Sequence, residues 1–130
     1  METTYITVDL ELYADQPFYT LLSFLNQKYQ GTEIYPPDQH HSQWMANISF
    51  TDYNSANRCL ESHCKWLESM PEDVRKEWNN ISHKVMNIGY NTSSTHQAFI
   101  EQIKPSVIKQ LSNLALGFAF TLYPIELEDQ

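Results

Sequence analysis

The chain has 130 residues, 42% of them hydrophobic and 13% aromatic, a composition typical of one packed domain spanning residues 1–130. Sixteen acidic against eight basic side chains give a formal net charge of -8, which disfavours nucleic acid and anionic membranes and favours basic protein partners. No apolar run reaches membrane-spanning length and the N-terminus lacks signal-peptide features, so we expect a cytoplasmic protein.

A strand is predicted over residues 5–13, because aliphatic and other residues alternate there strictly. The set expected to be buried is Ile6, Val8, Leu10 and Leu12. The set expected on the opposite face is Tyr5, Thr7, Asp9, Glu11 and Tyr13. An amphipathic helix follows, with Asp15 as its cap, Pro17 in its first turn and Gly31 at its end.

Residues 32–43 are predicted to form a loop, because Pro36 and Pro37 forbid a helix and interrupt a strand ladder. A second strand, 44–51, alternates again. Its expected buried residues are Trp44, Ala46, Ile48 and Phe50.

A long helix is predicted from the capping residues 52–55 to about Met70, and Pro71 starts a second, shorter helix. A third strand over 84–90 should bury Met86, Ile88 and Tyr90. Residues 91–97 are polar and predict a loop.

The last two elements are a helix that starts at Pro105 and a strand that begins after Gly117, the glycine expected where the helix ends. In this strand Phe118, Phe120 and Leu122 alternate with Thr121 and Tyr123, so we expect the first three to face the core. Acidic residues then close the chain: Glu126, Glu128 and Asp129.

The order β-α-β-α-α-β-α-β, with polar residues on one face of each strand, argues against a parallel sheet covered on both sides. The sequence predicts an α+β fold. We expect a two-layer sandwich, with one mainly antiparallel four-stranded sheet and about three to four helices packed on one face.

Candidate chemistry is sparse. Cys59 and His63 have the spacing that lets two helical side chains share a metal, but no third ligand is near in sequence, and both also fit a core. Two cysteines five residues apart on one helix are about 8–9 Å apart, too far for a disulfide, so Cys59 and Cys64 should be free.

The adjacent pair His40–His41 could bind a metal, or act as a base with Asp38, or simply be exposed. The chain has three glycines and contains none of the common catalytic or phosphate-binding motifs. We therefore expect a protein that is not an enzyme and uses no cofactor or metal.

The remaining candidate is a docking surface for a protein partner, in which acidic groups attract a basic protein and tyrosines supply contact area. Its predicted residues are Tyr5, Asp9, Glu11, Tyr13, Glu33, Asp38, Glu72, Asp73, Glu77 and Tyr123, with the acidic tail. An ordinary solvated sheet face would show the same pattern.

The chain also resembles a family of small bacterial domains of unknown function. The resemblance rests on Asn87–Tyr90, on the last helix with Pro105, Leu111 and Leu114, on the Leu122–Tyr123 pair, and on a second strand that opens with Trp44. Such domains are similar to immunity proteins in their gene setting, which implies a small acidic protein that neutralises one cognate toxin, for example a basic nuclease. Two alternatives remain open: a structural or adaptor domain that forms homodimers, and a small-ligand binder or enzyme that uses the His40–His41 loop.

Overall fold

The computed structural model describes residues 3–93 and 98–124. The predicted order of strands and helices is confirmed. The elements are β1 (Thr4–Ala14), α1 (Tyr19–Lys28), β2 (Trp44–Phe50), α2 (Ala56–Leu67), α3 (Glu72–Asn79), β3 (His83–Asn91), α4 (Pro105–Asn113) and β4 (Gly117–Tyr123).

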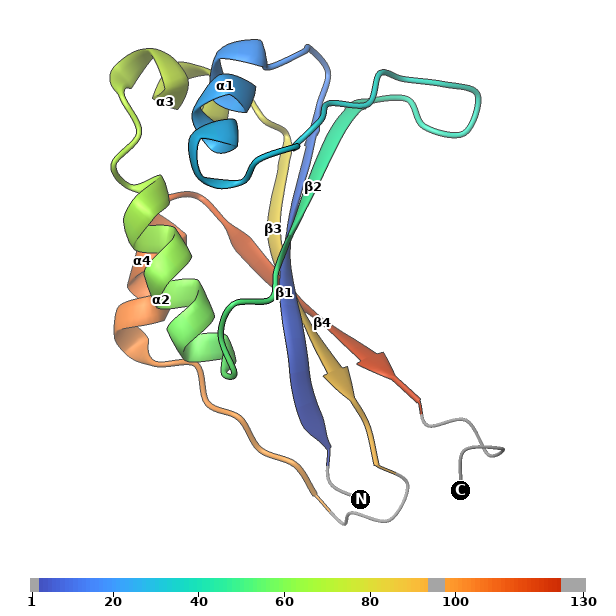
Figure 1. The fold of residues 1–130 in the computed structure, drawn as a ribbon, viewed down its shortest axis with the longest axis vertical. Helices are drawn as coiled ribbons and strands as arrows, with labels where there is room; N and C mark the ends of the chain where they lie inside the picture. The colour runs from blue at the N-terminus through green and yellow to red at the C-terminus, as the bar shows by residue number, and fades with distance from the viewer. Residues whose placement is uncertain (1–2, 94–97, 125–130) are drawn as a thin grey trace.

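The strands form one sheet in the order β2-β1-β3-β4. β1 pairs antiparallel with β2 and β3, and β4 runs parallel to β3. The four described helices all lie on one side of the sheet, and the other side is bare (Figure 1). The predicted α+β two-layer architecture with a mainly antiparallel sheet is therefore confirmed.

The core lies between the sheet and the helices. Val8, Leu10 and Leu12 on β1 are completely buried, as are Met86 and Ile88 on β3. The helices contribute a matching set of buried side chains: Leu21, Leu25, Leu60, Leu67, Trp78 and Leu111. The buried indole of Trp78 donates a hydrogen bond from Nε1 to the carbonyl oxygen of Leu114 (2.8 Å), so its one polar atom is satisfied.

A β-bulge at the start of β1 overturns part of the predicted alternation. Tyr5 pairs with Tyr90 and Thr7 pairs with Gly89, which leaves Ile6 as an extra residue. Ile6 is 38% exposed, and Tyr5 packs against the core with its ring 6.2 Å from that of Tyr90. The predictions that Ile6 is buried and that Tyr5 lies on the outer face were wrong, because a bulge reverses the alternation beyond it.

Two predicted helix ends differ from the structure. α1 begins at Tyr19 with no side-chain cap, and Asp15 instead accepts a hydrogen bond from Gln43 Nε2 (3.0 Å). At the end of α4 the residue with positive φ is Ala115 (54°), where the amide of Leu116 bonds to the carbonyl oxygen of Leu111, as in a Schellman motif. Gly117 already belongs to β4, so its predicted role in ending the helix was wrong.

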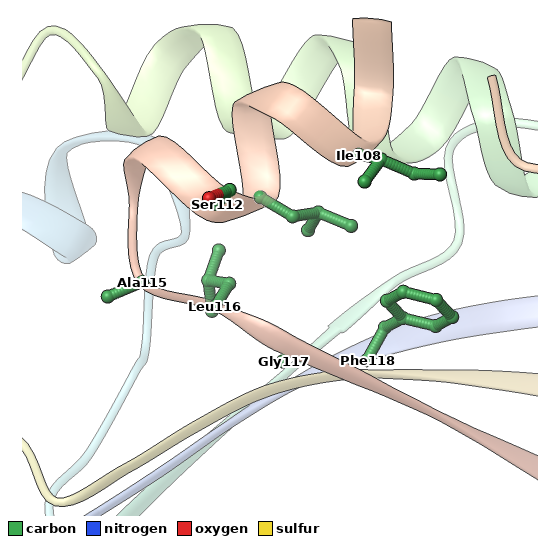
Figure 2. Close-up of a pocket in the computed structure, with 7 residues that line it drawn as sticks. Ile108, Ser112, Ala115, Leu116, Gly117 and Phe118 are labelled. Atoms are coloured by element: carbon green, nitrogen blue, oxygen red, sulfur yellow. The ribbon is translucent and has the colours of Figure 1, made fainter. Parts of the chain in front are cut away.

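The strand β4 lies in the predicted place, but its apolar residues are not covered. Phe118, Phe120 and Leu122 are 42%, 52% and 62% exposed. Beside them an open groove of about 430 Å³ separates α4 from the start of β4 (Figure 2). The expectation that these three side chains are buried was wrong, because the helix layer extends over β1 and β3 and leaves much of β4 uncovered.

Some predictions fall outside the described residues: positions 94–97 of the loop 91–97, and Glu126, Glu128 and Asp129 of the acidic tail. Among the described helices, none is long and apolar enough to cross a membrane.

Candidate functional site

The outer face of the sheet, the side without helices (Figure 1), is an uncovered surface that carries acidic side chains but no Lys or Arg. Asp9 and Glu11 lie on it at the middle of β1, about 7 Å apart along the strand. Asp9 pairs with Ser49 on β2 and Asn87 on β3, so uncharged residues flank it on both sides. None of the outward-facing residues is Lys or Arg. They are Thr7, Asp9, Glu11, Tyr13, Met45, Asn47, Ser49, His83, Val85, Asn87, Gly89, Ala119, Thr121 and Tyr123.

The two carboxylates differ in their contacts. Asn87 donates a hydrogen bond from Nδ2 to Glu11 Oε2 (3.2 Å), and Thr121 donates from Oγ1 to Asn87 Oδ1 (2.8 Å). His83 Nε2 lies 3.9 Å from Glu11 Oε1. By contrast, Asp9 Oδ1 is buried and has no hydrogen-bond partner. A shielded carboxylate oxygen without a donor is unusual in a folded protein and costs free energy.

Aromatic side chains stand at both ends of this face. Tyr13 packs edge-on against His83 with ring centroids 5.0 Å apart. Tyr123, 47% exposed, lies at the other end, where a Cβ on Gly89 would come within 3.3 Å of its ring. Gly89 therefore makes room for the Tyr123 ring. The outer face thus brings together four of the predicted partner-binding residues: Asp9, Glu11, Tyr13 and Tyr123.

Other predicted site residues lie elsewhere. Tyr5 faces the core, where its hydroxyl is shielded from solvent, and burial, followed by the neighbouring Cys59, raises its pKa. Glu72 and Asp73 are exposed in the first turn of α3, on the helix side of the sheet. Glu77 on the same helix accepts a hydrogen bond from the amide of Leu21 (2.9 Å), which ties α3 to α1. These residues do not join the outer face.

Glu33 and Asp38 lie in the loop between α1 and β2, which projects away from the helices (Figure 1). Asp38 Oδ1 accepts hydrogen bonds from the amides of His40 and His41, both 2.8 Å. The amide of His40, then that of His41, holds the pKa of Asp38 below its usual value. The Asp38 carboxylate thus stabilises its own turn, and the His40 and His41 side chains are exposed.

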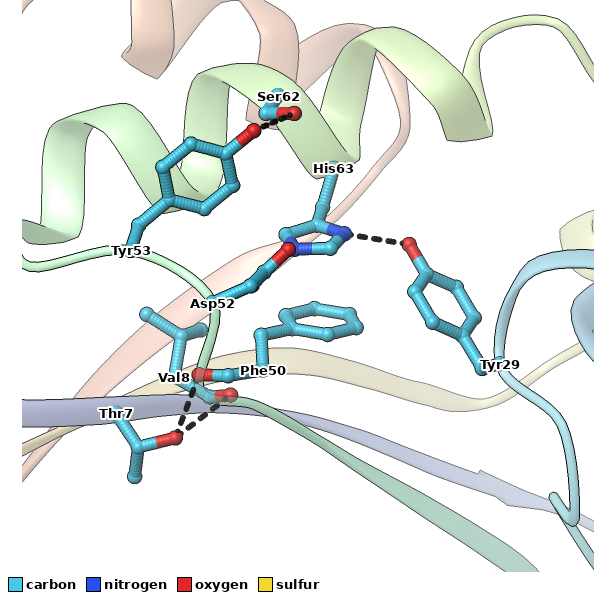
Figure 3. A network of polar contacts seen from close by, with 8 residues as sticks. All are labelled: Thr7, Val8, Tyr29, Phe50, Asp52, Tyr53, Ser62 and His63. Carbon is cyan, nitrogen blue, oxygen red and sulfur yellow. Dashed lines mark hydrogen bonds and ion pairs between the residues drawn. The ribbon is translucent and has the colours of Figure 1, made fainter.

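A buried polar network escaped the sequence analysis. His63 on α2 is 2% exposed and lies between Asp52, after β2, and Tyr29, after α1 (Figure 3). Its Nε2 lies 3.0 Å from Asp52 Oδ1 and its Nδ1 2.6 Å from the Tyr29 hydroxyl. Because an ionised carboxylate only accepts, Nε2–H donates to Asp52 and the Tyr29 hydroxyl donates to Nδ1. The ring also stacks on Phe50, with centroids 3.9 Å apart.

The electrostatics of the network favour this neutral tautomer. Burial lowers the pKa of His63 below its usual value, and the hydrogen bond and charge of Asp52 offset burial only in part. For Asp52, burial opposes ionisation, but the hydrogen bond and charge of His63 outweigh it and lower the pKa of the carboxyl group. Burial also raises the pKa of Tyr29, so its hydroxyl stays protonated as a donor. The network joins α1, α2 and the end of β2.

Cys59 lies close to this network, and Asp52 supplies the third ligand that the sequence spacing of Cys59 and His63 lacked. The Cys59 Sγ, an Asp52 oxygen and a His63 nitrogen lie within 4.8 Å of one another, which would suit a zinc ion. However, both ring nitrogens of His63 already have hydrogen-bond partners, and burial raises the pKa of Cys59 to about 11. A metal would have to break the His63–Asp52 bond and ionise this thiol, so the contacts fit a hydrogen-bonded core better than a metal site.

The second thiol, Cys64, is also free and buried, and burial raises its pKa to about 12. The prediction that both cysteines are free is confirmed. Neither thiol has the exposure and lowered pKa that a nucleophilic cysteine needs.

Comparison of the chain with protein-family models, with curated proteins and with solved structures finds no match. The resemblance to small bacterial domains of unknown function therefore stays a prediction.

Proposed function

We propose that this protein is a non-catalytic immunity protein that binds and neutralises a cognate, basic toxin domain, and that it docks through the outer face of the sheet. One observation carries the proposal: the bare outer face holds Asp9 and Glu11 at its centre with no Lys or Arg beside them. Within the described residues, Glu11 has an ion pair only with His83, and Asp9 has none.

The chemistry of the face fits a basic protein better than a small ligand. The carboxylates of Asp9 and Glu11, which are partly exposed, supply attraction at a distance. Tyr13 and Tyr123 add rigid apolar contact area at the two ends. A basic nuclease domain has the complementary charge, because it must itself attract nucleic acid. The cytoplasm is the proposed compartment, which is consistent with two free thiols.

The test is to co-express the protein with its neighbouring gene and to measure rescue of growth, the mass of any complex and the association rate. The double variant D9K/E11K is expected to slow association at low salt by about tenfold or more and to lose protection. The matched control is E61K/E68K, which makes the same charge change at exposed positions on the helix side. Equal effects of the two variants would show a net-charge effect and contradict docking at the outer face.

A second charge reversal separates the two acidic regions of the molecule. Glu72 and Asp73 on α3 lie on the side opposite Asp9 and Glu11. If E72K/D73K abolishes protection while D9K/E11K does not, the partner binds the helix layer. If the neighbour is not toxic and forms no complex, the immunity function itself is wrong.

A further inference from the structure

The free edge of the sheet carries a row of exposed apolar side chains, Phe118, Phe120 and Leu122, which we call the β4 row. They are in register with Met86, Ile88 and Tyr90 on β3, so both sets point to the helix side. The β3 set is at most 2% exposed, whereas the β4 row is 42–62% exposed. On the helix side of the sheet, the β3 side chains are therefore covered by other parts of the chain, whereas the β4 side chains next to them are not.

The β4 row continues into further apolar surface at both ends. Phe118 and Ile108 of α4 line the groove in Figure 2, and Ile108 is 46% exposed. At the other end the rings of Phe120, Tyr90 and Phe99 follow one another with centroids 6.3 and 5.3 Å apart. The exposed parts of these side chains amount to roughly 500 Å² of apolar area, within the range of about 300–600 Å² for the largest apolar patch on a typical monomer, a patch that is often functional.

The main chain of β4 is equally unprotected. β4 is the last strand of the sheet, and among the described residues no strand pairs with its outer edge. Its sequence from Gly117 to Tyr123 contains no charged residue and no proline, the usual means by which an edge avoids pairing. The opposite edge, β2, is partly covered by Tyr35, whose amide and carbonyl both bond to Met45.

The main-chain groups that point to the free edge belong to the same residues as the β4 row. The carbonyl oxygen of Tyr123 points toward β3, since it accepts from the amide of Thr92 (2.9 Å). Peptide groups alternate in direction along a strand, so the amides and carbonyls of Phe118, Phe120 and Leu122 point to the free edge. An added strand would therefore pair with the same residues whose side chains need cover.

We propose that the occupant of this edge is a second copy of the chain, and that two β4 strands pair antiparallel about a two-fold axis at Phe120. In that register Phe120 faces its own copy and Phe118 faces Leu122 of the other chain, so the six apolar side chains meet on one face. Such a contact is self-complementary, as a two-fold interface requires. The exposed area of these six side chains is at most about 700 Å², so with the paired main chain the contact is smaller than the roughly 1,200–2,000 Å² of a standard interface and the dimer is expected to be weak.

The composition of the edge favours self-pairing over the basic partner proposed for the outer face. The β4 row offers no charge to a basic protein, and for the same reason it opposes no second copy locally, although each chain has a net charge of -8. Pairing at the edge joins the sheets into one of eight strands and leaves the outer face open. The dimer is therefore independent of the proposed immunity function.

The first experiment is sedimentation equilibrium of the full chain over a wide range of protein concentration. We expect twice the monomer mass of 15.2 kDa, and F120K should return the protein to the monomer. The matched control is Y35K, because Tyr35 and Phe120 are both 52% exposed and lie at opposite edges of the sheet. A monomeric wild-type chain overturns the proposal, as does a dimer that Y35K breaks and F120K does not.

A cross-linking experiment tests the register and does not depend on F120K being folded. Facing residues of a hydrogen-bonded antiparallel pair have Cα atoms about 5.5 Å apart, within the span of a disulfide. Under mild oxidation F120C should therefore give a covalent dimer, and L122C, two residues away from the axis, should not. The native thiols of Cys59 and Cys64 are buried and do not compete. Cross-linking of L122C without cross-linking of F120C would overturn the register.

Discussion

The two faces of β1 differ in burial and in charge, although they belong to the same strand. On the helix side Val8, Leu10 and Leu12 are completely buried, and on the outer face Asp9 and Glu11 are partly exposed. Hydrogen bonding does not divide the two faces in the same way. The buried His63 on the helix side has a partner for both ring nitrogens, but the Tyr5 hydroxyl on that side and Asp9 Oδ1 on the outer face both lack one.

This difference indicates which residues stabilise the fold and which are available for binding. A buried polar group with all its partners adds to stability and specifies one packing, while a shielded carboxylate oxygen without a donor costs free energy. The apolar side chains on the helix side of β1 stabilise the fold by their burial. Asp9 and Glu11 on the outer face are partly exposed and so remain accessible to a partner.

The largest effect should come from shortening a side chain on the buried face of β1, compared with the same change on its outer face. Leu10→Ala removes a completely buried side chain and is expected to lower the free energy of unfolding by about 2–5 kcal/mol. Glu11→Ala, the next residue on the outer face, should cost only about 1 kcal/mol, since it loses one partly buried hydrogen bond and no core contact. Urea denaturation measures both. Equal costs would mean that the outer face is part of the folded core.

The pH dependence of stability should reveal the network on the helix side. Because the pKa of His63 is lower in the folded state, the unfolded chain binds the additional proton, so stability is complete above about pH 6.5 and falls as the pH drops below it. Asp52, whose pKa is also lowered, adds a second loss only below about pH 4. Urea midpoints from pH 7.5 to 5 test the first step.

The matched variants for this titration are His63→Gln and His40→Asn. Replacing His63 removes the titrating ring, so the loss between pH 6.5 and 5 should flatten even though the variant is less stable at pH 7. His40 lies in the exposed loop and its side chain has no contact with the core, so its variant should keep the wild-type slope. A slope that persists in His63→Gln would assign the pH dependence to another group.

The fold could be predicted from the sequence because its signals are local and repeated. Alternation in β1, β2 and β3 gave the strands and their buried faces, and Pro71 and Pro105 placed two helix starts. The predictions that were wrong concern features that depend on a single residue or on parts of the chain far away in the sequence. A single bulge turned Tyr5 inward, and Ala115 adopted the positive φ expected of a glycine. Alternation shows which residues share a face of a strand but not whether other elements cover that face, so it could not predict that Ile88 is buried and Phe120 exposed.

The candidate site could be predicted only in part, for a related reason. Asp9, Glu11 and Tyr13 share a face because a strand alternates, and the sequence shows this directly. Their isolation from Lys and Arg depends on which strands lie beside β1. Asp52 and Tyr29 are 11 and 34 residues from His63 in the chain, so the network appears only when α1, α2 and β2 are packed. His63 at helical spacing from Cys59 was the one signal available, and it favoured a core histidine over a metal ligand without identifying its hydrogen-bond partners.

The most direct test of the comparison is one isosteric change made on both faces, and its outer-face member should have the smallest effect on stability. Asp52→Asn keeps the shape but weakens the hydrogen bond from His63, and should lower the free energy of unfolding by about 1–2 kcal/mol. Asp9→Asn should leave stability unchanged or raise it by up to about 1 kcal/mol, because it removes a charge that has no donor and lies about 7 Å from Glu11. Urea denaturation of both variants at pH 7 gives the two values. If Asp9→Asn destabilises the protein as much as Asp52→Asn, the Asp9 carboxylate already has a stabilising role in the fold, and the argument that it remains available to a partner fails.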